Sequence, residues 1–91
     1  MRGARYTATP WVRSWLIGHP EEAMGVEAER LQMDGTLNLF GKSWKGPFEA
    51  HWHTTGAPEF DGYRASGATV LSAVQRVRQV AHEDLHPEEI A

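Results

Sequence analysis

The chain contains no cysteine, which excludes disulfide-stapled scaffolds, thiolate zinc fingers, iron–sulfur sites and cysteine nucleophiles. Basic residues are also scarce, because 9 Lys and Arg stand against 12 Asp and Glu. The net charge of −3 argues against nucleic acid as a partner, since phosphate attraction would have to overcome it. With 91 residues, the sequence predicts one domain, residues 1–91, with a modest hydrophobic core.

Long hydrophobic runs are missing as well. The most apolar stretch near the N-terminus, residues 11–17, is interrupted by Arg13 and Ser14. A secretory signal needs about 7–15 continuous apolar residues, and a membrane span needs about 20. We therefore expect a cytoplasmic protein that makes no contact with a membrane.

Catalytic patterns are equally scarce. The serines lie in no nucleophile-elbow sequence, no glycine-rich phosphate loop occurs, and no carboxylate pair stands out beyond adjacent glutamates. The sequence therefore predicts a protein that is not an enzyme and that carries no cofactor or metal.

One segment does match a catalytic pattern. His82-Glu83-Asp84-Leu85-His86 fits H-E-x-x-H, in which two histidines one helical turn apart bind zinc and the glutamate activates water. Pro87 follows at once, and the chain is too short for the fold that usually carries this pattern. We expect two exposed histidines near a helix C-terminus, where positive charge is favoured. Metal binding by this pair is the alternative.

The N-terminal third contains one predicted helix. Thr9, Pro10 and Gly18 are typical of a helix cap, a first helical residue and a helix stop, so they predict a helix over residues 10–17. A strand is the alternative, because tryptophan and valine favour strands. Residues 19–22 are expected to form a linker or a turn.

The middle of the chain has the signals of a small sheet. Asp34-Gly35 predicts a hairpin turn, and Lys45-Gly46-Pro47 predicts a second turn. After the second turn, apolar and polar residues alternate, which is typical of a strand with one buried face. The predicted strands cover residues 25–33, 36–42, 48–55 and 60–65, with approximate ends.

Residues 69–84 are predicted to form the main helix, capped by Thr69 and ended by Pro87. Its apolar residues recur at steps of 3 or 4, which places them in one stripe that can pack on a sheet. Residues 86–91 are expected to be a frayed tail. The stripe consists of Val70, Val74, Val77, Ala81 and Leu85.

These elements predict an α+β fold: a small antiparallel β-meander of three to four strands with a C-terminal amphipathic helix packed on one face. Residues 1–24 would form an N-terminal segment, residues 25–85 the meander and helix, and residues 86–91 the tail. The apolar face of the sheet is expected to bury the helix stripe. The opposite face would present Thr36, Asn38, Glu49, His51 and His53 to solvent or to a partner.

Two groups of polar and aromatic residues are candidates for binding. Glu49, His51 and His53 recur at alternate strand positions, a spacing that suits metal ligands or a pH-sensitive contact patch, although exposed histidines are also ordinary on an open sheet. The second group is a basic turn in which a tryptophan could stack on a base while the cations meet phosphate. A solvated hairpin is the alternative for this turn. The basic turn comprises Lys42, Trp44 and Lys45, with Arg64 on the neighbouring strand.

The 4 tryptophans are many for a chain of 91 residues. So small a domain has difficulty burying Trp11, Trp15 and Trp44 together, and exposed tryptophans are frequent at the centres of interfaces. We expect Trp11 and Trp15 to contact a protein partner or a second copy of the chain in a homodimer. The alternative is an N-terminal segment that folds back and buries its own tryptophans.

The stretch Pro58–Thr69, with its Gly67-Ala68-Thr69 turn and a following helix that carries Ala73, resembles the signature of HicB-like antitoxins. The resemblance covers about residues 31–84 and implies a β-β-β-α module. It departs from the family in that residues 1–30 have no counterpart and that no DNA-reading motif follows the helix. It therefore bears on the fold more than on the function.

Taken together, these features predict a non-catalytic binding module that acts by occluding a protein partner, as an antitoxin or a small phage-type inhibitor of a host system would. The alternative is a protein that sequesters a nucleotide or a small signalling ligand, and a zinc-dependent hydrolase is a third possibility. The residues expected to contact the partner or ligand are Trp11, Trp15, Lys42, Trp44, Lys45, His51, His53 and Arg64.

Overall fold

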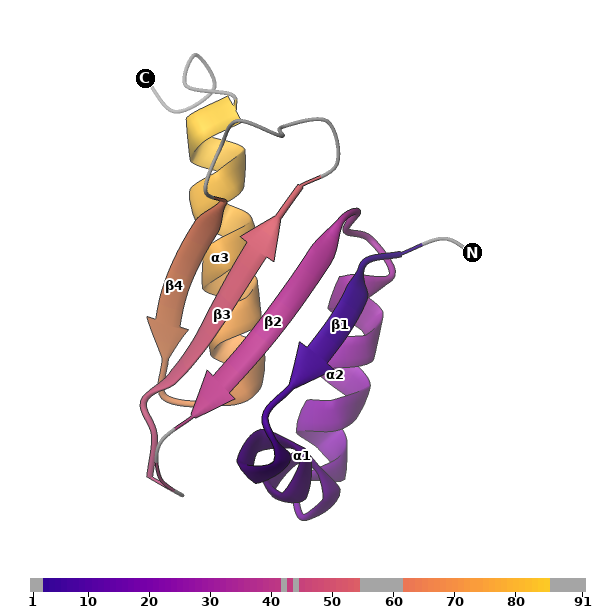
Figure 1. The fold of residues 1–91 in the computed structure, drawn as a ribbon, viewed down its shortest axis with the longest axis vertical. Coiled ribbons are helices and arrows are strands. Elements are labelled where there is room, and N and C mark those ends of the chain that lie inside the picture. The colour runs from indigo at the N-terminus through magenta and orange to yellow at the C-terminus, as the bar shows by residue number, and fades with distance from the viewer. Residues whose placement is uncertain (1–2, 42, 44, 55–61, 86–91) are drawn as a thin grey trace.

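The computed structural model describes residues 3–41, 43, 45–54 and 62–85. Its strands form one sheet in the order β1-β2-β3-β4 (Figure 1). Strands β2, β3 and β4 are antiparallel neighbours, whereas β1 runs parallel to β2. The predicted α+β fold is confirmed, with one parallel strand added to the meander. The elements are β1 (Arg5–Ala8), α1 (Pro10–Ile17), α2 (Pro20–Arg30), β2 (Thr36–Gly41), β3 (Phe48–His53), β4 (Tyr63–Gly67) and α3 (Val70–Leu85).

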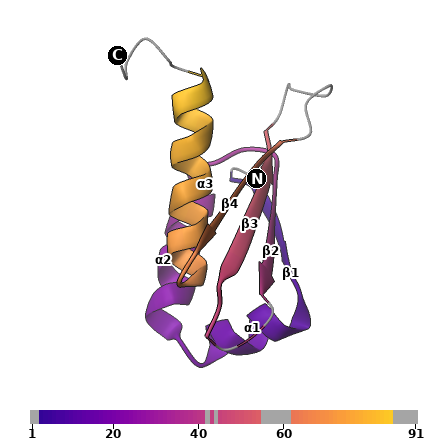
Figure 2. The same ribbon diagram turned by 90° about the vertical axis from the view of Figure 1, so that its left-hand side faces the viewer.

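The helices leave one face of the sheet uncovered. Helices α2 and α3 lie on the same side, α3 behind β3 and β4 and α2 behind β1, while α1 crosses one end of the sheet (Figures 1 and 2). The viewer of Figure 1 looks at the uncovered face, and Figure 2 shows the two layers from the side. The fold is therefore a two-layer sandwich with one solvent-facing sheet surface.

The core forms between the sheet and α3, as the alternation predicts. Phe48, Leu37 and Leu39 are at most 1% exposed and point toward the helices. The helix stripe from Val70 to Ala81 packs against them, and the residues on the opposite side of α3 are exposed or half-buried. The predicted packing face of the sheet is thus confirmed. The buried residues of α3 are Val70, Ala73, Val74, Val77 and Ala81.

The start of α3 is capped by its own side chains. The Ser72 amide donates to Thr69 Oγ1 at 3.1 Å, and the Thr69 amide donates to Ser72 Oγ at 3.0 Å. This reciprocal pair satisfies amide groups that a helix N-terminus otherwise leaves without partners. The predicted cap at Thr69 is confirmed.

The strand predicted over residues 25–33 is wrong, because these residues lie mostly in helix α2. The predicted linker over residues 19–22 is also wrong, since α2 begins at Pro20. Pro20 occupies the first helical position, two glutamates lie in the first turn, and Arg30 lies in the last, all of which favour a helix. With only Val26 fully buried, α2 has too weak an apolar stripe to be evident from periodicity.

Asp34-Gly35 consequently connects a helix to a strand and is not a hairpin turn. Gly35 has a φ of +78°, a backbone conformation that favours glycine. A Cβ at this position would overlap the carbonyl oxygen of His53. The sequence thus places a glycine turn at the right position, but the predicted hairpin is wrong because a helix precedes the turn.

The helix predicted over residues 10–17 is confirmed as α1. Thr9 occupies the cap position, although its side chain makes no capping hydrogen bond. The N-terminal segment also contributes to the single core, because Ala4, Val12 and Trp15 are buried in the same cluster as the sheet residues. Residues 3–30 are thus integrated into the fold, even though the family resemblance offered no counterpart for them.

The remaining predicted boundaries shift by a few residues. The third predicted strand ends at His53 and the last begins at Tyr63. Residues 60 and 61, with which the last strand was expected to begin, and the expected tail over residues 86–91 lie outside the described residues.

Candidate functional site: the open face of the sheet

The surface of the sheet that the helices leave uncovered is accessible and extends over all four strands, and we call it the open face. Side chains along a strand alternate between faces, so every second residue of each strand points away from the helices. None of these residues is buried, whereas most of their neighbours on the helix side are. The open face comprises Arg5, Thr7, Thr36, Asn38, Phe40, Glu49, His51, His53, Arg64 and Ser66.

At the middle of the open face, His51 contacts two neighbours. Its Nε2 lies 2.9 Å from Glu49 Oε1, and its ring centroid lies 4.8 Å from that of Phe40 with a 53° tilt. Because a carboxylate only accepts hydrogen bonds, Nε2 carries the proton in this contact. In neutral His51 the lone pair therefore lies on Nδ1, which is left to accept a hydrogen bond from a ligand.

Arg64 lies directly opposite His51 in the β3–β4 register. Its side chain is exposed, and no carboxylate within the described part of the chain pairs with it. The register thus places Arg64 beside His51, a proximity that the sequence alone did not predict. An unpaired guanidinium beside an aromatic pair can bind a carboxylate or a phosphate through two parallel hydrogen bonds.

A small depression of about 270 Å³ lies at the end of the open face next to Phe40. The Phe40 ring and Pro47 supply apolar walls, and Glu49 supplies a carboxylate. The Thr9 hydroxyl oxygen is buried and has no hydrogen-bond partner among the described residues. Such a depression can receive one side chain or one ring of a ligand. It is lined by Thr9, Phe40, Gly41, Pro47 and Glu49.

No family model, curated protein or solved structure matches this chain. Within the described residues, no helix is both long enough and apolar enough to cross a membrane.

The predicted contact residues form three groups: those of the open face, those of the basic turn, and the tryptophans of α1. His51 and His53 lie on the open face, as expected, and Arg64 lies on it as well. Lys45 is exposed in the turn before β3, whereas Lys42 and Trp44 lie outside the described residues.

The expectation of a tryptophan contact surface at the N-terminus needs correction. Trp15 is only 4% exposed, with its ring 4.7 Å from the Phe48 ring and stacked on His19 at 3.8 Å. Trp11 is half-buried and packs against the core. The alternative, in which the N-terminal segment buries its own tryptophans, describes Trp15 correctly because α1 closes the end of the sheet.

Phe40 is a site residue that the sequence interpretation missed. Its side chain is 39% exposed. Strand parity carried the signal, because Leu37 and Leu39 point to the core and the next residue must then point outward. An exposed phenylalanine on a central strand is one of the few apolar groups that this polar surface offers.

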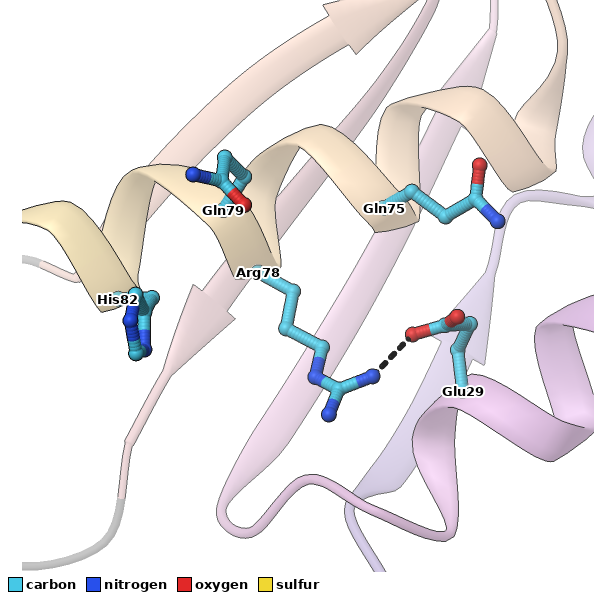
Figure 3. A pocket seen from close by; sticks show the side chains of 5 residues that line it. All are labelled: Glu29, Gln75, Arg78, Gln79 and His82. Atoms are coloured by element: carbon cyan, nitrogen blue, oxygen red, sulfur yellow. Dashed lines mark hydrogen bonds and ion pairs between the residues drawn. The ribbon is translucent and has the colours of Figure 1, made fainter.

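A second depression, of about 330 Å³, lies between α2 and α3 on the opposite side of the molecule. Figure 3 shows Arg78 extending from α3 toward Glu29 of α2, where its Nη1 lies 2.7 Å from Glu29 Oε2. Gln79 is also engaged, since its amide donates to Glu83 at 3.1 Å. The charged pair that lines this depression, Arg78 and Glu29, is thus satisfied within the chain. An ion pair at this exposure contributes only about 0–1 kcal/mol to stability.

The H-E-x-x-H segment is only partly described. His82 lies in the last turns of α3, is exposed and lines the α2–α3 depression, whereas His86 lies outside the described residues. Within the part of the chain that the structure describes, no three histidine, aspartate or glutamate side chains are grouped closely enough to hold a metal ion. This holds for Glu49, His51 and His53 as well.

Proposed function

We propose that this protein is a non-catalytic binding module that holds a protein partner on its open face and acts by occluding it. The observation that carries the proposal is the exposed Phe40 ring, which stands on an uncovered sheet between a small depression and the His51–Arg64 pair. Aromatic residues and arginines are the residue types that contribute most to protein interfaces. A partner side chain in the depression would bury the exposed part of this ring.

The architecture supports the choice of this face. The apolar sides of the helices pack against the sheet, and the α2–α3 depression contains a charged pair that is satisfied within the chain. The open face, by contrast, carries an arginine without a carboxylate partner among the described residues. A surface whose polar groups still have binding capacity gains more from a partner than one whose groups are already paired.

In this role the protein would be an antitoxin-like protein or a small phage-type inhibitor that works in the cytoplasm. The resemblance to HicB-like antitoxins remains a prediction that agrees with this role. Self-association as a homodimer is part of the same proposal, and sedimentation at micromolar concentrations tests it.

Quantitative affinity capture from extracts of the source cells tests the function. The baits are the native chain, Phe40→Ser and Val80→Ser, because Phe40 and Val80 are both 39% exposed but lie on the open face and on α3. We expect a protein that the native and Val80→Ser baits recover and that Phe40→Ser recovers at least about tenfold less. The proposal is overturned if no protein is recovered or if both variants recover the same proteins equally.

The ring pair of Phe40 and His51 beside Arg64 favours a second candidate, a sequestering protein for a nucleotide or small signalling ligand. A base could stack on the rings while the guanidinium binds phosphate. Thermal unfolding with nucleotides tests it, because a ligand at 100 times its Kd stabilises the fold by about 2.7 kcal/mol. Arg64→Gln should abolish the shift and Arg76→Gln should retain it.

A further inference from the structure

The acidic character of the chain is distributed unevenly between its two layers. Among the described residues, the open face carries two arginines and two histidines against one carboxylate, Glu49. Helices α2 and α3 carry six carboxylates against three arginines and one histidine. The net charge of −3 therefore does not describe the open face, which is the more basic surface. The six helix carboxylates are Glu21, Glu22, Glu27, Glu29, Glu83 and Asp84.

The ion pairs of the described residues reinforce this difference. Arg30 pairs with Glu27 at 2.8 Å and Arg78 pairs with Glu29 at 2.7 Å, so these helix cations are engaged within their own layer. Arg64 on the open face has no such partner in the described ranges. It is the cation of the open face that lies closest in register to the Phe40–His51 pair.

From this charge placement we infer that the partner presents an acidic, extended peptide segment containing one aromatic or large aliphatic side chain. The inference rests on the proposed function and names the chemistry of its partner. A partner carboxylate would accept two hydrogen bonds from Arg64, and the apolar side chain would enter the depression beside Phe40. The strand spacing and rise put the Cα atoms of these two residues roughly 12 Å apart, which an extended peptide spans in about four residues.

The same placement disfavours a nucleic-acid strand. A single strand carries one phosphate per nucleotide and needs a continuous track of cations. Among the described residues, the open face has Arg5 and Arg64 on its two outer strands, with Glu49 on one of the strands between them. Phosphates that follow the strand would meet this carboxylate, whereas a peptide can place its few carboxylates only where guanidinium groups lie.

Fluorescence anisotropy with defined probes tests the inference. The first probe is a labelled peptide in which glutamate alternates with serine around one central phenylalanine, so that the glutamates and the phenylalanine share one face when it is extended. The second replaces every glutamate by glutamine, and the third is oligothymidine. We expect the acidic peptide to bind at least about tenfold more tightly than the glutamine peptide, and less tightly as salt increases.

Two matched variants locate the binding. Arg64→Glu and Arg76→Glu change the net charge equally, and both arginines are exposed, but Arg76 lies on α3 away from the open face. We expect Arg64→Glu to weaken binding of the acidic peptide at least about tenfold and Arg76→Glu to change it less than about twofold. Circular dichroism of both variants tests whether the fold is retained. Arg64→Gln, which removes the charge without reversing it, serves as a milder replacement.

The inference is overturned if the acidic peptide binds no better than the glutamine peptide, if the two charge-reversed variants bind it equally, or if oligothymidine binds more tightly through Arg64. These outcomes differ from a failure of the proposed function. A cellular protein whose capture depends on Phe40 but which contacts no acidic segment would leave the function standing and remove only this inference.

Discussion

The hydroxyl of Tyr63 donates a 2.8 Å hydrogen bond to a carboxylate oxygen of Asp84, and this contact joins the outer strand β4 to the last turns of α3. Burial of the phenol is the main cause that raises the pKa of Tyr63 above its ordinary value, and the hydrogen bond and negative charge of Asp84 raise it further. Since β4 contributes Arg64 to the open face, this bond also holds one part of the candidate site in place.

Removing this hydroxyl should lower stability and change its dependence on pH. At pH 7, we expect Tyr63→Phe to lose about 0.5–1.5 kcal/mol in the free energy of unfolding, measured with urea. Because the folded-state pKa is raised, the stability from Tyr63 is complete below about pH 10 and is lost as the pH rises through the folded-state pKa. Tyr63→Phe should therefore lose less stability than the native chain as the pH rises above about 10. Tyr6→Phe is the control, because Tyr6 is 43% exposed, and an equal alkaline loss in native and Tyr63→Phe proteins would contradict the prediction.

Two phenylalanines on opposite faces of the sheet should respond differently to truncation. Phe48 is 1% exposed in the core, and Phe48→Ala is expected to cost about 3–5 kcal/mol. Phe40 is 39% exposed on the open face, and Phe40→Ala should cost less than about 1 kcal/mol. Urea unfolding of both variants measures the difference. Similar losses would show that the open face is covered in solution.

The turn between α2 and β2 requires glycine. Gly35→Ala places a Cβ against the His53 carbonyl oxygen at a φ of +78°, so we expect a loss of at least about 1–3 kcal/mol. Gly18→Ala is the matched control, because its φ is −79° and the nearest atom to an added Cβ is 3.6 Å away. Its effect on thermal unfolding should stay within about 1 kcal/mol of zero. Equal losses would argue against the described turn.

The reciprocal cap of α3 should behave as a unit. We expect Thr69→Ala to cost about 0.5–2 kcal/mol, because the Ser72 amide loses its acceptor. Ser72→Ala should also be destabilising, since the Thr69 amide loses the Ser72 hydroxyl. The double variant should lose less than the two single losses combined, which a double-mutant cycle in urea measures. Strict additivity would mean that the two bonds form independently.

Much of the C-terminal part of the fold could be predicted because its signals are local. The α3 stripe and the Thr69 cap depend on residues three or four apart, and the β3 alternation depends on residues two apart. The open-face positions of His51 and His53 follow from the same alternation. Helix α2 was not predicted because Val26 is its only fully buried residue, so it has no clear apolar periodicity. Its start is marked instead by Pro20 and by the glutamates of its first turn.

By itself, the sequence determined the α+β class, the main helix, the cap at Thr69 and the two-faced character of β3, because each depends on spacing along a few neighbouring residues. Only the tertiary structure decided the parallel pairing of β1 with β2, which joins Arg5 to Thr36 across two intervening helices. It also decided that Trp15 is buried, that Arg64 lies beside His51, and that most carboxylates of the described residues lie on the helix layer. These features depend on contacts between residues far apart in the chain, and the long-range packing that brings such residues together leaves no periodic signal in the sequence.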